Sequence, residues 1–124
     1  MEIRMKQQLA LFLMAFAAVG VHAQSVQIAP EQVMTGNSSA FADGVWVRVT
    51  GLVGHANCFF APLNASLFYT RPGGVVDPKK ALAILMTAKL AGRTVNIEFI
   101  NDGSQADFWG YGISQCEIQR LVLN

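Results

Sequence analysis

The stretch KKALAILMTAKLAGRTVNIEF, residues 79–99, decides the fold of this chain because it predicts one helix followed by one strand. Asp77 is placed to cap the helix, Pro78 suits its first turn, and Gly92 suits the position just after its last turn. From residue 94 to residue 100 apolar side chains fall at every second position, which is the period of a strand with one buried face. The block therefore predicts a helix packed against a sheet.

Apolar residues nearly surround the axis of the predicted helix, and only Lys80 and Thr87 mark a narrow polar strip. A helix of this kind usually buries two faces, one of them on its own sheet. We therefore expect the second face to meet another subunit of a homo-oligomer. The residues expected at that interface are Leu82, Leu85, Met86 and Lys89. The alternative is a helix deep in its own barrel, with the long lysine side chains reaching solvent.

The remaining pattern is mostly that of strands. Val45, Val47 and Val49 alternate with polar or aromatic residues, and further strands are predicted at residues 66–70 and 117–123. An early strand is expected within residues 25–34, where Pro30 must interrupt or bend it. Residues 36–44, bounded by glycines, predict a turn between the first two strands. The fold class expected is mainly β with one helix.

The amino terminus has the pattern of a signal peptide. Arg4 and Lys6 precede the uncharged run LALFLMAFAAV, residues 9–19. Val21-His22-Ala23 then offers small residues at the two positions that a signal peptidase reads, which predicts cleavage after Ala23. Residues 1–23 are therefore expected to be removed, leaving residues 24–124 as one domain in the periplasm or outside the cell, without membrane insertion. The alternative is an uncleaved membrane anchor, although the apolar run is short for a span.

The charge balance argues against two classes of partner. Loss of Glu2, Arg4 and Lys6 with the leader leaves seven basic and seven acidic residues, a formal net charge near zero. Such a balance argues against binding nucleic acid or an anionic membrane through bulk charge. A domain of 101 residues has a modest core, so a disulfide or a subunit contact would help to stabilise it.

The two cysteines predict one disulfide, between Cys58 and Cys116, because an exported chain meets an oxidising compartment. Closing that loop would stabilise the fold by about 4 kcal/mol in the chain-entropy model. The competing interpretations are a zinc site or a reactive thiol. Zinc needs more nearby ligands, and His55 is the single histidine after the leader, so no metal or other cofactor is expected.

The apolar spacing of the helix and strand block resembles a known family. The pattern Leu82-x2-Leu85-x2-Ala88-x3-Gly92-x2-Val95-x-Ile97, followed by a loop and a cysteine that opens a final strand, is similar to the secreted binding subunits of pentameric AB-type toxins, especially the subtilase cytotoxin binding subunit. The resemblance covers roughly residues 58–123. It implies a small, five-stranded, OB-like, partly open barrel with a helix that lines the centre of a ring. None of the family's glycan-contacting residues is carried over to this chain.

The best candidate for recognition is the segment NDGSQADFWGYGISQ, residues 101–115, between two predicted strands. Asp107, Trp109 and Tyr111 are the expected ligand-binding residues, because an aromatic ring stacks on a sugar while carboxylates and amides bond its hydroxyls. The alternative is structural, with Phe108 and Trp109 plugging the end of the barrel. Asn101, Asp102 and Asp107 carry oxygen ligands of the kind that calcium prefers, but no EF-hand spacing is present, so no calcium site is expected.

Other clusters predict packing. Phe59, Phe60, Phe68 and Tyr69 are expected to pack around the disulfide. Trp46 and Arg48 share the outer face of one strand, where ordinary cross-strand surface pairing is expected and a stacking platform is the alternative.

The sequence predicts no enzyme. His55 would serve as a base only beside a nucleophile and an orienting acid, and no catalytic motif such as Gly-x-Ser-x-Gly occurs. Two classes remain: a non-catalytic, oligomeric, glycan-binding subunit, and a small periplasmic accessory or inhibitor protein that binds another protein.

Overall fold

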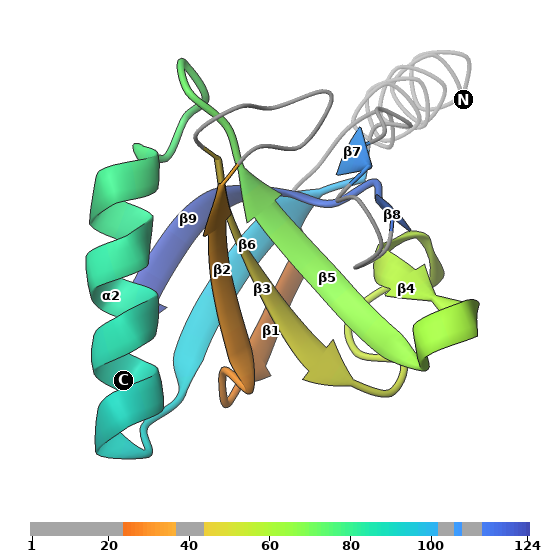
Figure 1. The fold of residues 1–124 in the computed structure, drawn as a ribbon, viewed down its shortest axis with the longest axis horizontal. Helices are drawn as coiled ribbons and strands as arrows, with labels where there is room; N and C mark the ends of the chain where they lie inside the picture. The colour runs from red at the N-terminus through yellow and green to blue at the C-terminus, as the bar shows by residue number, and fades with distance from the viewer. Residues whose placement is uncertain (1–23, 37–43, 102–105, 108–112) are drawn as a thin grey trace, which may run out of the picture.

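The computed structural model describes residues 24–36, 44–101, 106–107 and 113–124. Over these described residues the fold is mainly β with one α-helix, as predicted (Figure 1). The strands are β1 (Gln24–Ile28), β2 (Gln32–Gly36), β3 (Gly44–Thr50), β4 (Phe59–Phe60), β5 (Ala65–Thr70), β6 (Val95–Ile100), β7 (Ala106–Asp107), β8 (Ile113–Ser114) and β9 (Glu117–Leu123). The helix is α2 (Pro78–Ala91), and two short 3-10 turns are η1 (Ala56–Cys58) and η2 (Ala61–Leu63). The predicted signal peptide lies outside the described residues.

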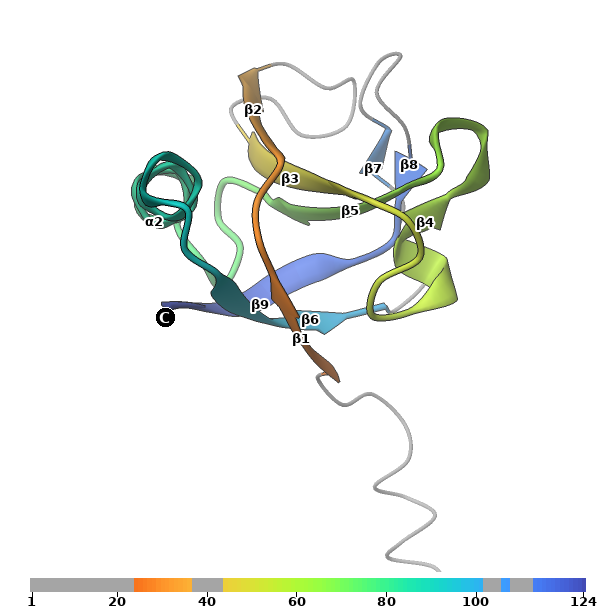
Figure 2. The ribbon, with the colours of Figure 1, turned by 90° about the horizontal axis from the view of Figure 1, so that it is seen from below.

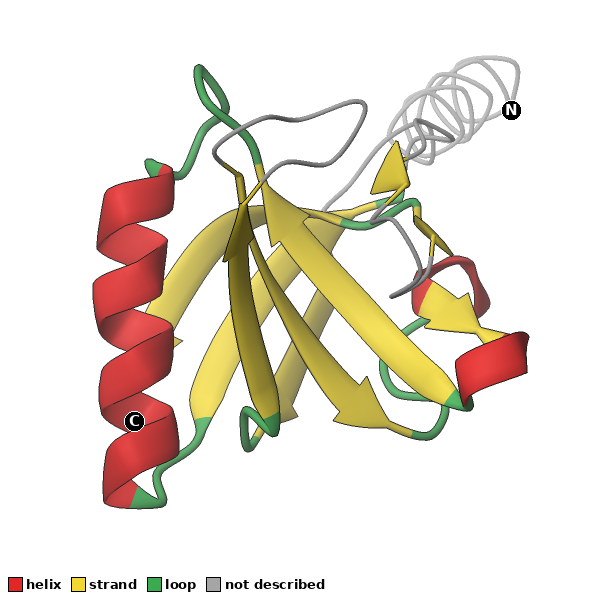
Figure 3. Ribbon diagram, in the orientation of Figure 1, coloured by secondary structure: helices red, strands yellow, loops and turns green. Residues whose placement is uncertain are grey.

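One open, mixed sheet forms the body of the protein. Its strand order is β1-β6-β9-β5-β3-β2, with β4 added beside β5, and the β5–β9 pair is parallel whereas the other pairs are antiparallel. The sheet curls so strongly that β1, β6 and β9 face β2, β3 and β5 across the interior (Figure 2). Figure 3, which is coloured by secondary structure, shows α2 (Pro78–Ala91) beside this curl. The expected five strands are corrected to seven in the main sheet, with β7 and β8 as a separate pair.

Pro30 divides the early strand, as the sequence predicts. β1 ends at Ile28 and pairs with β6, whereas β2 starts at Gln32 and pairs with β3, so the two halves border opposite ends of the sheet. The carboxylate of Glu31 accepts a hydrogen bond from the Thr50 backbone N–H, which ties the bend to the end of β3. The Gly36–Gly44 pair ends the β2–β3 ladder. The turn predicted between them, residues 37–43, lies outside the described residues.

The main core fills the space inside the curl. The predicted alternation is confirmed: Val45, Val47 and Val49 of β3 are buried on the face where Val95, Ile97 and Phe99 of β6 also lie. Further fully buried members of the core are Phe68, Leu85, Ile118 and both cysteines. The rings of Phe68 and Phe99 meet edge to face with their centroids 5.1 Å apart, a favoured aromatic geometry.

A second apolar cluster lies on the opposite face of β3 and β5. Trp46, Leu67 and Tyr69 form it, and the partly buried Met34 and Phe60 pack against it. Trp46, expected at the surface beside Arg48, is only 5% exposed, so that expectation is corrected. The aromatic residues expected around the disulfide are likewise divided, because Phe68 belongs to the main core whereas Phe60 and Tyr69 belong to this cluster.

The helix begins and ends where the sequence predicts. Gly92 adopts φ +65°, the left-handed conformation that suits glycine after a last helical turn, and its N–H bonds Ala88 and Lys89 carbonyls. Asp77 stands at the cap position, but its side chain makes no capping hydrogen bond, which corrects the predicted role.

α2 buries one narrow face, which consists of Pro78, Ala81, Leu85 and Ala88. It contacts β2, β3 and β9, and so covers the side of the curl between the two halves of the sheet (Figure 1). Leu82 and Ile84 pack partly against the core. Leu90, on the outward side, is 79% exposed. The helix is therefore not enclosed in its own barrel, and that alternative is excluded for the single chain.

Cys58 and Cys116 form the predicted disulfide, with their Cα atoms 5.3 Å apart. Both cysteines are fully buried. The bond joins the end of η1 to the residue before β9, at the base of the segment expected to bind ligand. Within the part of the chain that the structure describes, no helix is long and apolar enough to cross a membrane.

Candidate functional site

Residues 101–116 connect β6 to β9 and contain the expected ligand-binding residues. Asp107 lies in β7 and pairs with Ile113 of β8. Trp109 and Tyr111 lie outside the described residues, as do Asp102 and Phe108. The β7–β8 pairing thus brings Asp107 close to the returning arm of the connection. The short strands β7 and β8 were not predicted, since two-residue strands leave no periodic signal.

The returning arm of this connection is fastened to the body of the fold. The Ser114 hydroxyl donates to the Leu67 carbonyl at 2.6 Å and accepts from the Cys116 N–H at 3.1 Å. The Gln115 N–H donates to the Asn57 carbonyl at 3.3 Å. The Tyr69 N–H donates to the Cys116 carbonyl at 3.1 Å. Together with the disulfide, these hydrogen bonds fix the carboxyl-terminal end of the connection against β5 and η1.

An ion pair between a half-exposed guanidinium and a buried carboxylate holds the start of β9. Arg71 Nε lies 2.9 Å from Glu117 Oε1, and the Glu117 side chain is only 7% exposed. Such a pair costs desolvation and contributes mainly when its geometry and further contacts are good. Gly74 lies close by, because a Cβ there would approach Glu117 Oε2 to 3.1 Å. Glu117 therefore positions the turn at residues 71–74 beside β9.

Buried hydroxyls in this fold bond to backbone. Thr70 Oγ1 donates to the Val45 carbonyl and accepts from the Val45 N–H, at 3.0 and 3.2 Å. Ser66 Oγ donates to the Gly51 carbonyl at 2.7 Å and accepts from the Val53 N–H at 2.9 Å. His55, considered as a base, accepts from the Asn57 N–H through Nδ1 at 3.0 Å and so caps η1. These groups serve as structural ties.

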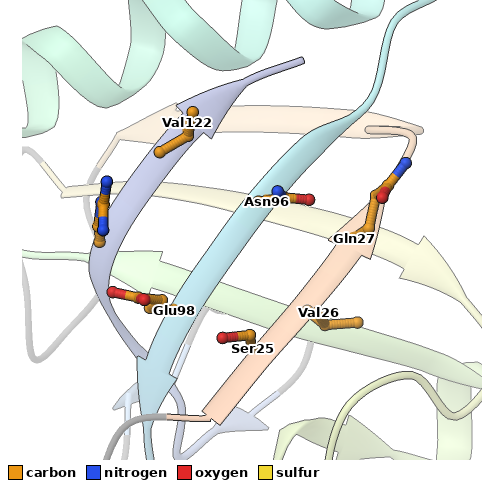
Figure 4. Close-up of a pocket in the computed structure, with 7 residues that line it drawn as sticks. Ser25, Val26, Gln27, Asn96, Glu98 and Val122 are labelled. Atoms are coloured by element: carbon orange, nitrogen blue, oxygen red, sulfur yellow. The ribbon is translucent and has the colours of Figure 1, made fainter.

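A polar concavity lies on the outer face of β1, β6 and β9 (Figure 4). It has a volume of about 370 Å³. Its lining residues are Ser25, Val26, Gln27, Asn96, Glu98, Arg120 and Val122. The strand alternation predicts Asn96 and Glu98 as outward residues, but nothing in the sequence predicts which strands stand beside them. This concavity was therefore missed.

The expected interface residues of α2 divide into three kinds. Leu85 is fully buried in the core of its own chain, so it cannot lie on an exposed interface. Leu82 and Met86 are half-buried, and Lys89 is exposed. The outward surface of the helix consequently includes these three residues together with the exposed residues Lys79, Lys80, Ala83, Thr87, Leu90 and Ala91.

Among the described residues, no group of three or more His, Cys, Asp or Glu side chains could hold a metal ion. No protein-family model, curated protein or solved structure matches the chain. A functional assignment therefore has to come from the geometry of these surfaces.

Proposed function

We propose that the protein is a secreted or periplasmic, non-catalytic binding module, and that residues 101–115 bind glycans. One observation carries the proposal: the connection between β6 and β9 is long and rich in aromatic and carboxylate residues, yet its returning arm is fastened by Ser114, Gln115 and the disulfide. Binding residues commonly sit on loops that a rigid scaffold positions. A buried disulfide fits the oxidising compartment of a secreted or periplasmic protein.

The proposed architecture is OB-like. If β1 and β2 count as two halves of one bent strand, five long strands remain, with the helix between the third and the fourth. A five-stranded, partly open barrel is the OB description, and such barrels bind oligosaccharides through the loops between strands 1 and 2 and between strands 4 and 5. In this chain those loops correspond to residues 37–43 and 101–116.

A glycan array probed with disulfide-bonded residues 24–124 tests the proposal. Trp109→Ala should remove the strongest signal, and Tyr111→Ala and Asp107→Asn should each weaken it at least tenfold. Gln105→Ala is the control in the same loop and should bind like wild type. No glycan signal above background, or a signal that survives Trp109→Ala, would overturn the proposal.

A second candidate is a protein-binding role for the outward face of α2, in a ring-shaped homo-oligomer or with an accessory partner. The observation that favours it is the 79% exposure of Leu90 beside the half-buried Met86 and Leu82. Native mass spectrometry should show an oligomer that Leu90→Glu dissociates and that Leu52→Glu, also at an exposed leucine, leaves intact. A monomeric wild type would exclude the homo-oligomer.

A further inference from the structure

The polar concavity described above presents two rows of side chains across three strands. The register places Ser25, Glu98 and Arg120 side by side on β1, β6 and β9. Two residues further along, Gln27, Asn96 and Val122 form the second row. Neighbouring strands lie about 4.8 Å apart, so each row spans about 10 Å. The grid is the size of a small polar molecule.

Glu98 and Arg120 lie directly opposite each other on β6 and β9, but their side chains form no ion pair. In the part of the chain that the structure describes, the ion pair observed is Arg71–Glu117, and neither Glu98 nor Arg120 takes part in one. Figure 4 shows the Glu98 carboxylate directed toward β9. A carboxylate and a guanidinium therefore stand one strand apart in an open concavity, each with its hydrogen-bonding capacity available.

A β-bulge turns Arg120 to this face. Phe99 pairs with Ile118 whereas Glu98 pairs with Arg120, which leaves Gln119 as an extra residue on β9. Strict alternation from the buried Ile118 would direct Arg120 inward, but after the bulge Arg120 and Val122 are exposed. Bulges re-aim side chains and are common beside functional sites.

The amides of the second row are held in place. Gln27 Nε2 donates to Thr94 Oγ1 at 3.0 Å, and Asn124 Nδ2 donates to Asn96 Oδ1 at 3.2 Å. The side-chain carbonyl oxygen of Gln27 can still accept a hydrogen bond from a ligand, and the side-chain NH₂ group of Asn96 can still donate one. Orientation of polar groups before binding lowers the entropy that binding costs.

We propose that this concavity binds a small zwitterion of the α-amino-acid type, with Glu98 accepting hydrogen bonds from the ammonium and Arg120 donating to the carboxylate. Gln27 and Asn96 would then bond a polar ligand side chain. Adjacent groups of opposite charge complement a molecule that carries both charges close together. None of the described residues that line the concavity is aromatic, so they do not supply the stacking on which sugar sites rely. The residues named for this site belong to β1, β6 and β9 and not to the connection between β6 and β9.

Chemical-shift titration of ¹⁵N-labelled residues 24–124 with L-glutamine tests this site. Saturable shifts in the millimolar range are expected at residues 25–27, 96–98 and 120–122. N-acetyl-L-glutamine lacks the ammonium group and L-glutaminamide lacks the α-carboxylate. Each should therefore bind at least tenfold more weakly than L-glutamine. Glucose is the neutral control and should leave these signals unmoved.

Glu98→Gln and Arg120→Gln should each weaken L-glutamine binding at least tenfold, whereas Arg93→Gln, at the exposed residue after the helix, should not. The proposal is overturned if L-glutamine causes no saturable shift, if the blocked analogues bind equally well, or if both variants bind like wild type. Glycan-array binding is measured separately on the same variants, so a failure here is distinguishable from a failure of the glycan proposal.

Discussion

Replacing Leu85 by alanine tests how α2 is attached to the sheet. Leu85 is fully buried among core residues, and truncation of such a leucine removes apolar contacts and leaves a cavity. The expected loss in the free energy of unfolding is about 2–5 kcal/mol. For a domain of this size, a loss of about 3 kcal/mol corresponds to a fall in Tm of roughly 12–24 °C.

Leu90→Ala is the matched control, because it makes the same chemical change on the same helix at a side chain that is 79% exposed. Its expected effect is within about 0.5 kcal/mol. Urea denaturation of residues 24–124 with the disulfide intact, monitored by far-ultraviolet circular dichroism, gives the free energy of unfolding of both variants. The comparison holds where the m-values of the two variants equal that of wild type. Equal losses for the two variants, or a loss below about 1 kcal/mol for Leu85→Ala, would refute the assignment of the buried face.

Three further predictions concern the body of the fold. Cys58→Ala with Cys116→Ala should cost about 4 kcal/mol in urea denaturation, because the bond closes a loop with a sequence separation of 58, and reduced wild type should match the double variant. Gly54→Ala should lower the free energy of unfolding by roughly 1–3 kcal/mol, because the φ of Gly54 is +80° and the new Cβ would lie 3.1 Å from the Phe99 ring. Gly51→Ala is the control in the same assay and should lower it less, because Gly51 has a similar φ of +88° but no atom within 4 Å of the new Cβ. Thr70→Val should cost about 1–3 kcal/mol because it removes both bonds to Val45, whereas Thr87→Val on the exposed face should be near neutral by thermal denaturation.

The elements with strong periodicity were predictable from the sequence. α2 carries proline and glycine at its two ends, and β3, β6 and β9 each show a run of alternating or β-rich residues, so local chemistry determines where they start and stop. The disulfide followed from the number of cysteines and the expected compartment. These features depend on residues close together in the chain.

What the sequence missed depends on contacts between distant segments. The bulge at Gln119 leaves no local signature, yet it decides that Arg120 lies outward beside Glu98. The burial of Trp46 follows from its position opposite Tyr69 on β5, which cannot be deduced from β3 alone. Likewise the apolar pattern of α2 did not reveal which residues face the core, since small residues such as Ala81 and Ala88 are fully buried whereas the larger Leu90 is exposed.

The recognition surface is the central claim, and an amide chemical-shift map with the glycan that gives the strongest array signal tests it most directly. If the connection between β6 and β9 is the binding site, the largest shifts will fall within residues 101–115, while the outer face of β1, β6 and β9 and the exposed side of α2 remain unmoved. Largest shifts at Asn96 and Glu98, or along α2, would contradict that claim.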